Sequence, residues 1–141
     1  MKQMETTLVL LKPDAIQKRL AGTIIQRFES AGLRIRGCKL IVLSEAVLRE
    51  HYRHLVSFVF FPEIVAFMQS SPVLALALEG PNSVAKVRDL VGPTDSKIAP
   101  KGTLRGDMGD DKMRNLVHAS DSSENAVLEI KRFFSESEIV P

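Results

Sequence analysis

Four short runs of apolar residues predict β-strands. The run over residues 6–11, TTLVLL, is continuous and suits a strand that is buried on both faces. It ends at Lys12-Pro13-Asp14, because proline cannot extend a central strand. The second run first alternates between polar and apolar residues and then becomes wholly apolar, which predicts a strand with a bulge at Gly37. The four predicted strands cover residues 6–11, 33–44, 73–80 and 115–119.

Between these strands, apolar residues recur at the spacing of α-helices. A helix closed by Gly32 is predicted from Leu20, Ile24, Ile25, Phe28 and Ala31; a second from Val47, Leu48, His51, Tyr52 and Leu55; and a short third beginning near Pro62. Residues 81–91 predict a helix capped by Asn82 or Ser83. The last helix buries Ala126, Val127, Ile130, Phe133 and Phe134, and Asp121 with Glu124 suits a capping box at its start.

The order of these elements predicts the fold class. Strands and helices alternate as β-α-β-(αα)-β-α-loop-β-α, which favours an α+β fold with a ferredoxin-like, four-stranded antiparallel sheet (a split βαβ unit) and helices packed on it. Residues 1–141 contain no internal repeat, low-complexity tract or linker, so we expect a single domain.

Composition and charge narrow the class of protein. With 45% hydrophobic and 26% charged residues, the chain is typical of a globular protein and not of a disordered one. Its 19 Lys and Arg are interspersed with 17 Asp and Glu, for a net charge of +2, and only 6% of residues are aromatic, which argues against dedicated nucleic-acid binding. No run approaches the roughly 20 apolar residues that span a membrane, and the N-terminal run is too short for a signal peptide. We therefore expect a cytoplasmic protein without membrane contact.

The single cysteine, Cys38, cannot form an internal disulfide. It lies in an apolar stretch, so we expect a small buried hydrophobe in preference to a reactive thiol.

Residues 92–114 show no periodicity and contain four glycines and two prolines. Structureless segments of this length are either functional or disordered. Because the segment leads directly into the strand that holds His118, we favour function.

Basic and amide side chains lie at the ends of several predicted elements. Lys12 ends the first strand, Arg88 flanks the buried face of its helix, Arg105 lies in the long loop, and Asn115 and His118 follow it. Taken singly, each suits a solvated charge or a structural partner. Taken together, they offer the cationic and amide donors that bind a polyphosphate. The sequence has no phosphate loop of the G-x-x-x-x-G-K-[ST] type and no Cys/His cluster with zinc spacing.

His118 is either a satisfied core histidine or a reactive imidazole at the floor of a site. Glu129 lies at the margin of the apolar stripe of the last helix, about 100° from its centre. It either faces water or accepts the proton of one imidazole nitrogen, which would leave the other nitrogen free as a nucleophile. Of the other histidines, we expect His51 to be buried and structural and His54 to be exposed.

Several motifs occur in order along nearly the whole chain: LVLLKPDA, GLRIRGCKL, HY at 51–52, PVLALALEG, VRDLVGPTDS, GTLRGD and NLVHASDS. From Thr6 to Val140 the chain closely resembles the nucleoside diphosphate kinases. Chance similarity is excluded because the K-P-D, G-T-x-R-G-D and N-x-x-H-A-S-D motifs keep the spacing of the family.

This resemblance implies roles for individual residues. It implies that His118 takes the γ-phosphoryl group of a nucleoside triphosphate, mainly ATP, and passes it to a nucleoside diphosphate with ping-pong kinetics, and that Glu129 orients its ring. Tyr52 and Ser120 are implied near the transferred phosphate and beside the histidine. The implied nucleotide-binding residues are Lys12, Phe60, Arg88, Thr94, Arg105 and Asn115, with the base stacked on Phe60.

The resemblance also implies a cofactor and an assembly. The cofactor is Mg²⁺, held mainly by nucleotide phosphates and water and by no metal-ligand set of the protein. The assembly is a homo-oligomer, either a tetramer or a hexamer. The chain departs from the common family pattern at Phe58-Val59, where many members have Arg-Pro, and also at Ser96 and Met108. The competing hypothesis is a ferredoxin-like nucleotide-binding or regulatory module without turnover.

Overall fold

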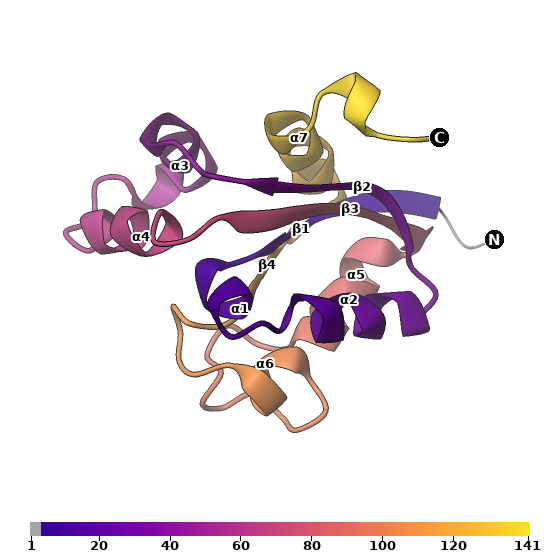
Figure 1. Cartoon of the computed structure of the whole chain (residues 1–141), viewed down its shortest axis with the longest axis horizontal. Helices are drawn as coiled ribbons and strands as arrows, with labels where there is room; N and C mark the ends of the chain where they lie inside the picture. Colours follow the sequence, from indigo (N-terminus) through magenta and orange to yellow (C-terminus); the bar gives the residue numbers. More distant parts are fainter. Residues whose placement is uncertain (1–3) are drawn as a thin grey trace.

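All four predicted strands are present, and they form one antiparallel sheet in the order β2-β3-β1-β4 (Figure 1). The structure, a computed structural model, describes residues 4–141. The strands are β1 (Met4–Leu11), β2 (Arg34–Ile41), β3 (Val73–Pro81) and β4 (Val117–Ala119). The strand β3 lies between β1 and β2 and is antiparallel to both, which is the arrangement of a split βαβ unit. The predicted ferredoxin-like sheet is therefore confirmed.

The central strand β1 is buried on both faces, as its continuous apolar sequence predicts. Successive strand residues point to opposite faces, so Val9 and Leu11 join one apolar cluster while Leu8 and Leu10 join the other. The face of the sheet that holds Val9 is covered by four helices: α1 (Pro13–Gln17), α2 (Ala21–Ser30), α5 (Ser83–Val91) and α6 (Leu104–Met108). The Leu8 face is covered by α3 (Glu45–His51), α4 (Phe61–Met68) and α7 (Ser123–Phe133) (Figure 1).

Two short 3-10 helices complete the described elements, η1 (Arg53–Leu55) and η2 (Glu136–Glu138). Three local predictions are confirmed. The register of β2 against β3 shifts next to Gly37, as expected for a bulge. Gly32 follows α2 with a φ of 89°. The short helix α4 has Pro62 in its first turn. The helix predicted from Leu20 to Ala31 is α2; the short helix α1 before it was not predicted, and Arg19, with a left-handed φ of 59°, separates the two.

The predicted structureless segment 92–114 contains a helix, α6, and that part of the prediction is wrong. The Thr103 hydroxyl accepts a hydrogen bond from the Gly106 amide at 3.0 Å and so caps the helix. A five-residue helix offers too few turns for an apolar periodicity to be read from its sequence.

Three further predictions differ from the structure. The side chain of Ser122, not Asp121, caps α7 by accepting from the backbone N–H of Asn125, and Asp121 accepts instead from the side-chain amide of Asn125 at 2.6 Å. Asn82 is the N-cap residue of α5, one of the two predicted, but it is in a left-handed conformation and its side chain makes no capping bond; a carboxylate oxygen of Glu5 accepts instead from the Val84 amide at 3.0 Å. Cys38 is exposed, because it lies on β2, an edge strand that has a neighbouring strand on one side only.

No helix within residues 4–141 combines the length and the apolar character needed to cross a membrane.

Candidate functional site

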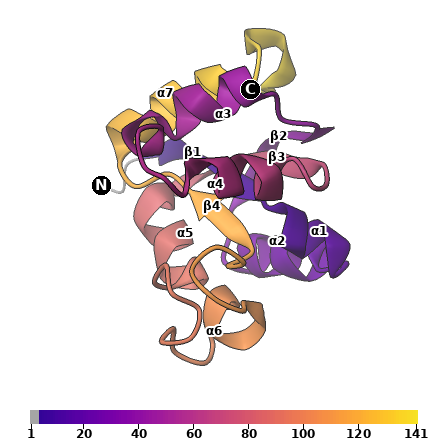
Figure 2. The ribbon, with the colours of Figure 1, turned by 90° about the vertical axis from the view of Figure 1, so that its left-hand side faces the viewer.

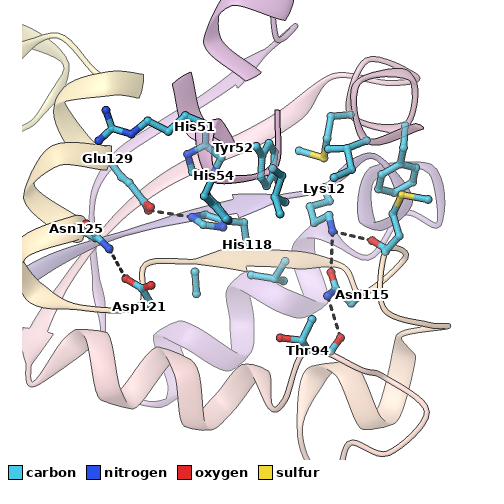
Figure 3. A pocket seen from close by; sticks show the side chains of 18 of the residues that line it. Lys12, His51, Tyr52, His54, Thr94, Asn115, His118, Asp121, Asn125 and Glu129 are labelled. Carbon is cyan, nitrogen blue, oxygen red and sulfur yellow. Dashed lines mark hydrogen bonds and ion pairs between the residues drawn. The ribbon is translucent and has the colours of Figure 1, made fainter. Parts of the chain in front are cut away.

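A cavity of about 780 Å³ opens beside β4, one of the two edge strands of the sheet. In Figure 2, β4 faces the viewer with α4 above it and α5 and α6 below. Nine of the ten predicted site residues line this cavity, and Figure 3 shows several of them converging from different elements. They are Lys12, Tyr52, Phe60, Arg88, Thr94, Arg105, Asn115, His118 and Glu129.

The side of the sheet on which His118 lies follows from strand pairing. His118 is directly opposite Leu10 of β1, and directly opposed residues of an antiparallel pair share a face. Leu10 packs in the cluster that includes Phe133 of α7. His118 therefore faces α7, while its neighbours Val117 and Ala119 pack on the opposite face against the other cluster.

The carboxylate of Glu129 meets the imidazole of His118. The Nε2 atom of His118 lies 2.9 Å from Oε1 of Glu129, and the hydroxyl of Ser120 donates to the same oxygen at 2.8 Å. Partial burial raises the pKa of Glu129, but the hydrogen bonds and charge of His118, together with Ser120, hold it below its ordinary value. An ionised carboxylate on Nε2 keeps the proton there, which leaves Nδ1 of His118 as the ring nitrogen with a free lone pair.

Ser120 does not line the cavity. It is fully buried behind Glu129, and its Oγ also accepts from the amide of Leu8 at 3.3 Å. Ser120 therefore contacts the carboxylate of Glu129, which in turn contacts the imidazole of His118.

Lys12 and Asn115 form the buried centre of a hydrogen-bond network. The Nζ atom of Lys12 donates to Oδ1 of Asn115 at 2.8 Å and to the carbonyl of Met113 at 2.7 Å. The amide of Asn115 donates in turn to the carbonyls of Thr94 and Lys112, both at 3.0 Å (Figure 3). Burial lowers the pKa of Lys12 to about 8, against the opposite effect of the nearby Asp14 carboxylate.

Arg105 organises the chain that leads into β4. Its guanidinium donates to three backbone carbonyls, those of Asn115 at 3.2 Å, Gly92 at 2.9 Å and Val117 at 2.6 Å. Burial and, after it, the charge of Arg88 lower the pKa of Arg105 to about 10. Arg88 of α5 lies at the other side of β4, with Nη1 3.4 Å from the carbonyl of Ala119. The guanidinium groups of Arg88 and Arg105 and the ammonium group of Lys12 therefore lie around one cavity.

Aromatic residues form another part of the lining. Burial raises the pKa of Tyr52, which follows α3, and the charge of Glu129 raises it further, so its phenol stays protonated. Phe60 is 41% exposed and lies parallel to Phe58, with ring centroids 5.3 Å apart at 20°. The ring of Phe60 offers an apolar face to a planar ligand.

His51 is a member of this site that its sequence pattern did not identify. It is buried, as predicted, but it also lines the cavity, and its ring lies 4.3 Å from that of His118. The only sequence signal for this role is its adjacency to Tyr52. His54 is exposed as predicted.

The arrangement can bind an anionic ligand and present one nucleophilic nitrogen to it. Cations and amides bind phosphate oxygens, and the free Nδ1 of His118 lies beside them. Donor atoms of His51, His118 and Glu129 lie within 4.8 Å of one another, yet imidazole nitrogens are poor ligands for Mg²⁺, which prefers oxygen.

Comparison with known proteins gives one family. Residues 5–139 match the family model described as "Nucleoside diphosphate kinase". A curated relative, the nucleoside diphosphate kinase of Wolinella succinogenes, is 49% identical over 136 residues, which cover 96% of this chain and 99% of the relative.

Solved structures agree with this match. A halophilic nucleoside diphosphate kinase from Halobacterium salinarum, in complex with CDP, has a TM-score of 0.95 and 39% identity, over 99% of this chain and 93% of that one. The nucleoside-diphosphate kinase of Borrelia burgdorferi, a transition state mimic with bound vanadate and ADP, has a TM-score of 0.91 and 31% identity, over 98% of this chain and 91% of that one.

Proposed function

The chain belongs to the nucleoside diphosphate kinase family and is an enzyme of that family, and we propose that it transfers the γ-phosphoryl group through a phosphohistidine on His118. The donor is a nucleoside triphosphate, mainly ATP, and the acceptor is a nucleoside diphosphate. One observation carries the proposal: the contact of Glu129 with Nε2 directs the nucleophilic character of His118 to Nδ1, in a cavity whose lining includes the cationic side chains of Lys12, Arg88 and Arg105.

The covalent step conserves the proton on the ring. The lone pair of Nδ1 attacks the γ-phosphorus, the bond from that phosphorus to the bridging oxygen breaks, and the nucleoside diphosphate leaves with the electron pair. The proton on Nε2 stays in its hydrogen bond to Glu129, whose charge offsets the positive charge that forms on the imidazole. The second half-reaction reverses these steps on another nucleoside diphosphate, which gives ping-pong kinetics.

The cationic residues supply positioning and charge neutralisation. Phosphoryl transfer depends mainly on these two effects, so Lys12, Arg88 and Arg105 can serve without further covalent chemistry. We assign the phosphates and ribose to these three residues with Thr94 and Asn115. The phenol of Tyr52 stays protonated and can donate to the transferred phosphoryl group.

Stacking on Phe60 places the base at the exposed end of the cavity. Every nucleobase has a π-face, so stacking without hydrogen bonds to the base edge tolerates all common bases.

Mg²⁺ belongs to the proposal as an ion bound to the nucleotide. The described side chains around the phosphate end are mainly cations and amides, which suit phosphate oxygens better than a metal ion. Phosphate oxygens and water would therefore hold Mg²⁺, which offsets their charge during transfer.

Assembly into a tetramer or a hexamer and a cytoplasmic location stay predictions. Equilibrium sedimentation of the whole chain would separate the two oligomers.

The test is the intact mass of the protein after brief exposure to ATP and Mg²⁺, and again after addition of GDP. We expect the wild-type chain to gain one acid-labile phosphoryl group and to lose it to GDP. His118→Ala should gain none while keeping the unfolding midpoint of the wild type within a few degrees. A nucleotide-binding module without turnover would bind ATP and gain no phosphoryl group, and this outcome would refute the proposal.

A further inference from the structure

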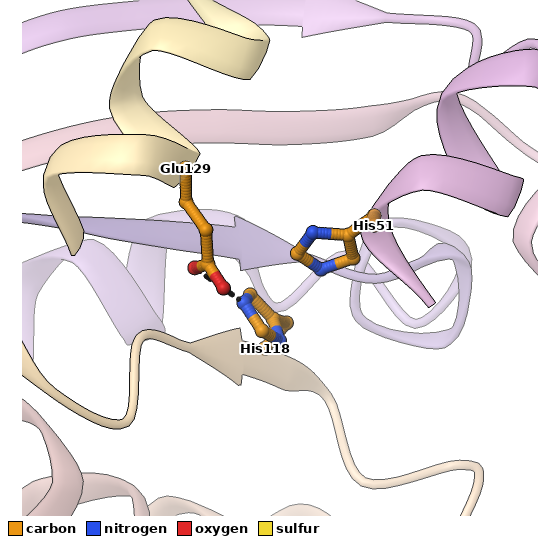
Figure 4. Close-up of side chains that lie close together, drawn as sticks. All are labelled: His51, His118 and Glu129. Atoms are coloured by element: carbon orange, nitrogen blue, oxygen red, sulfur yellow. Dashed lines mark hydrogen bonds and ion pairs between the residues drawn. The ribbon is translucent and has the colours of Figure 1, made fainter. Parts of the chain in front are cut away.

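His51 makes an edge-to-face contact with the imidazole of His118. It is the last residue of α3, it is 8% exposed, and its ring stands at 78° to that of His118 with centroids 4.3 Å apart. Figure 4 shows the edge of His51 directed at His118 from α3, while Glu129 approaches His118 from α7. Two elements far apart in sequence therefore contact the same imidazole ring.

Arg132 determines which nitrogen of His51 carries the proton. Its Nη1 lies 2.9 Å from Nδ1 of His51, and a guanidinium can only donate. Nδ1 of His51 must accept, so the neutral ring carries its proton on Nε2. Burial, followed by the neighbouring charges of His118 and Arg132, disfavours the cationic form and lowers the pKa of His51 to about 3. Arg132 also pairs with Glu50 across 3.3 Å.

The Nε2–H group of His51 has no hydrogen-bond acceptor among residues 4–141 although it is buried. An unpaired buried donor is costly, so its retention calls for a physical reason. The electron-rich face of an aromatic ring attracts such an edge, and here that face belongs to His118. The contact partly compensates the donor and restricts the neighbouring ring.

One hydrogen bond does not define the plane of an imidazole. The contact with Glu129 fixes Nε2 of His118 but leaves the ring able to tilt about that bond. The edge of His51 against the face of the ring opposes this tilt. Together the two contacts define the direction of Nδ1, which the phosphoryl transfer requires.

The same residues could be read as a metal site, since their donor atoms lie within 4.8 Å of one another. A metal ion needs a lone pair from each imidazole. However, Arg132 occupies the lone pair of His51 Nδ1, and Nε2 of His51 carries a proton. The contacts therefore favour a positioning role over metal binding.

We propose that His51, oriented by Arg132, is a positioning residue that holds the plane of the His118 imidazole so that Nδ1 points at the transferred phosphoryl group. This inference rests on the proposed function, in which His118 is the nucleophile. It goes beyond that function because it assigns the orientation of the nucleophile to two side chains instead of one. A misdirected nucleophile slows the chemical step and leaves nucleotide binding intact.

The test uses two substitutions that each preserve one half of the ring. The amide of His51→Asn lies near the position of Nδ1 and keeps the partner of Arg132, but it cannot reach His118. The longer His51→Gln can present an N–H near the position of Nε2. Single-turnover phosphorylation by ATP, measured over a range of ATP concentrations, separates the limiting rate from the binding constant.

We expect His51→Asn to lose 10- to 100-fold in the limiting rate with ATP binding changed less than twofold, and His51→Gln to recover at least a third of the wild-type rate. Urea unfolding of both variants monitors stability. Equal losses of rate in both variants, in step with equal losses of stability, would mean a merely structural role and would overturn the proposal.

The ¹⁵N NMR shifts of the imidazole nitrogens provide a second readout. We expect the wild-type His51 to be the neutral Nε2–H tautomer, and an Nδ1–H tautomer would overturn the proposal. If wild-type His118 is not phosphorylated at all, the proposed function fails. If it is phosphorylated and His51→Asn matches the wild type in rate, only the role of His51 fails.

Discussion

At one end of the cavity, Lys12, Arg105 and Asn115 are buried and hydrogen-bonded to one another or to backbone carbonyls. At the other end, Phe60 lines the cavity and stacks on Phe58, which lies outside it; both rings are about half exposed and have no polar partner. At the first end, the hydrogen bonds must offset the free-energy cost of removing charged groups from water. The second is an apolar surface whose side chains need only each other.

This difference teaches where substitution is tolerated. A buried cation that supports backbone carbonyls cannot change without leaving those carbonyls unpaired. An exposed aromatic pair can change at the cost of some contact area alone. Of the departures from the family pattern that the resemblance implies, Phe58-Val59 lies at this exposed end.

Arg105→Met gives the largest expected effect. Three backbone carbonyls lose their donor, and water that enters the space replaces only some of the lost hydrogen bonds. We therefore expect the free energy of unfolding to fall by about 3 kcal/mol. The loss of a phosphate-facing charge should lower kcat/KM by roughly 100-fold or more. Urea unfolding and steady-state kinetics measure the two effects.

Arg114→Met is the matched control for that prediction. Arg114 lies in the same segment, but its side chain is 54% exposed and its ion pair with Asp111 spans 3.6 Å. Exposed pairs contribute about 0–1 kcal/mol, so this variant should unfold nearly as the wild type does. Equal stability of the two variants would contradict the comparison between the buried and exposed ends.

Lys12 should couple nucleotide binding to proton uptake. With its pKa near 8, the amine of the free protein loses its charge as the pH rises through 8. A bound polyphosphate raises this pKa, so binding takes up a proton and weakens by up to about tenfold per pH unit above 8. Calorimetry at pH 8.5, in two buffers of different ionisation enthalpy, measures the uptake. Lys12→Met should lose it, and an unchanged uptake in that variant would assign the proton to another group.

Stability should respond to pH in the opposite direction. The pKa of Lys12 in the folded chain lies below its ordinary value of 10.5, so the unfolded chain binds more protons between pH 8 and 10.5. The contribution of this group to the free energy of unfolding therefore rises with pH across that window, while affinity for nucleotide falls.

The fold was predictable because each strand is marked by a continuous or alternating apolar run and each long helix by an apolar period. The continuous run before Lys12 predicts a central strand, and β1 lies at the centre of the sheet. The short helix α6 and the exposure of Cys38 were not predictable, since a cap at Thr103 and the width of a sheet depend on tertiary structure. Capping of α7 failed because Asp121 and Ser122 are both good caps and lie next to each other.

The site was predictable to a different degree. Periodicity placed Glu129 at the margin of its helix, where both facing water and facing His118 were allowed, and the pattern alone favoured water. The paired register of His118 with Leu10 decides between them, and no single sequence shows that register. His51 lies in an apolar stripe of its helix, and such a stripe looks the same in sequence whether it faces the core or a cavity. Its contact with His118 was therefore missed.

The base end gives the smallest expected effects. Stacking of one base on an aromatic side chain contributes about 1–3 kcal/mol, so Phe60→Ala should raise the KM for nucleoside diphosphates about tenfold with kcat retained. Phe58 supports Phe60 from outside the cavity, and such an aromatic pair contributes about 0.5–1.5 kcal/mol.

Phe58→Ala should therefore raise KM only about threefold at most, and more for GDP than for CDP, because the larger base covers more of the Phe60 ring. Val59→Ala is the control, since Val59 is 95% exposed and should leave KM unchanged. Steady-state kinetics with GDP and CDP as acceptors measure the three variants. If Phe58→Ala behaves as Val59→Ala does, the second ring does not support the platform, and Phe60 alone forms the base end.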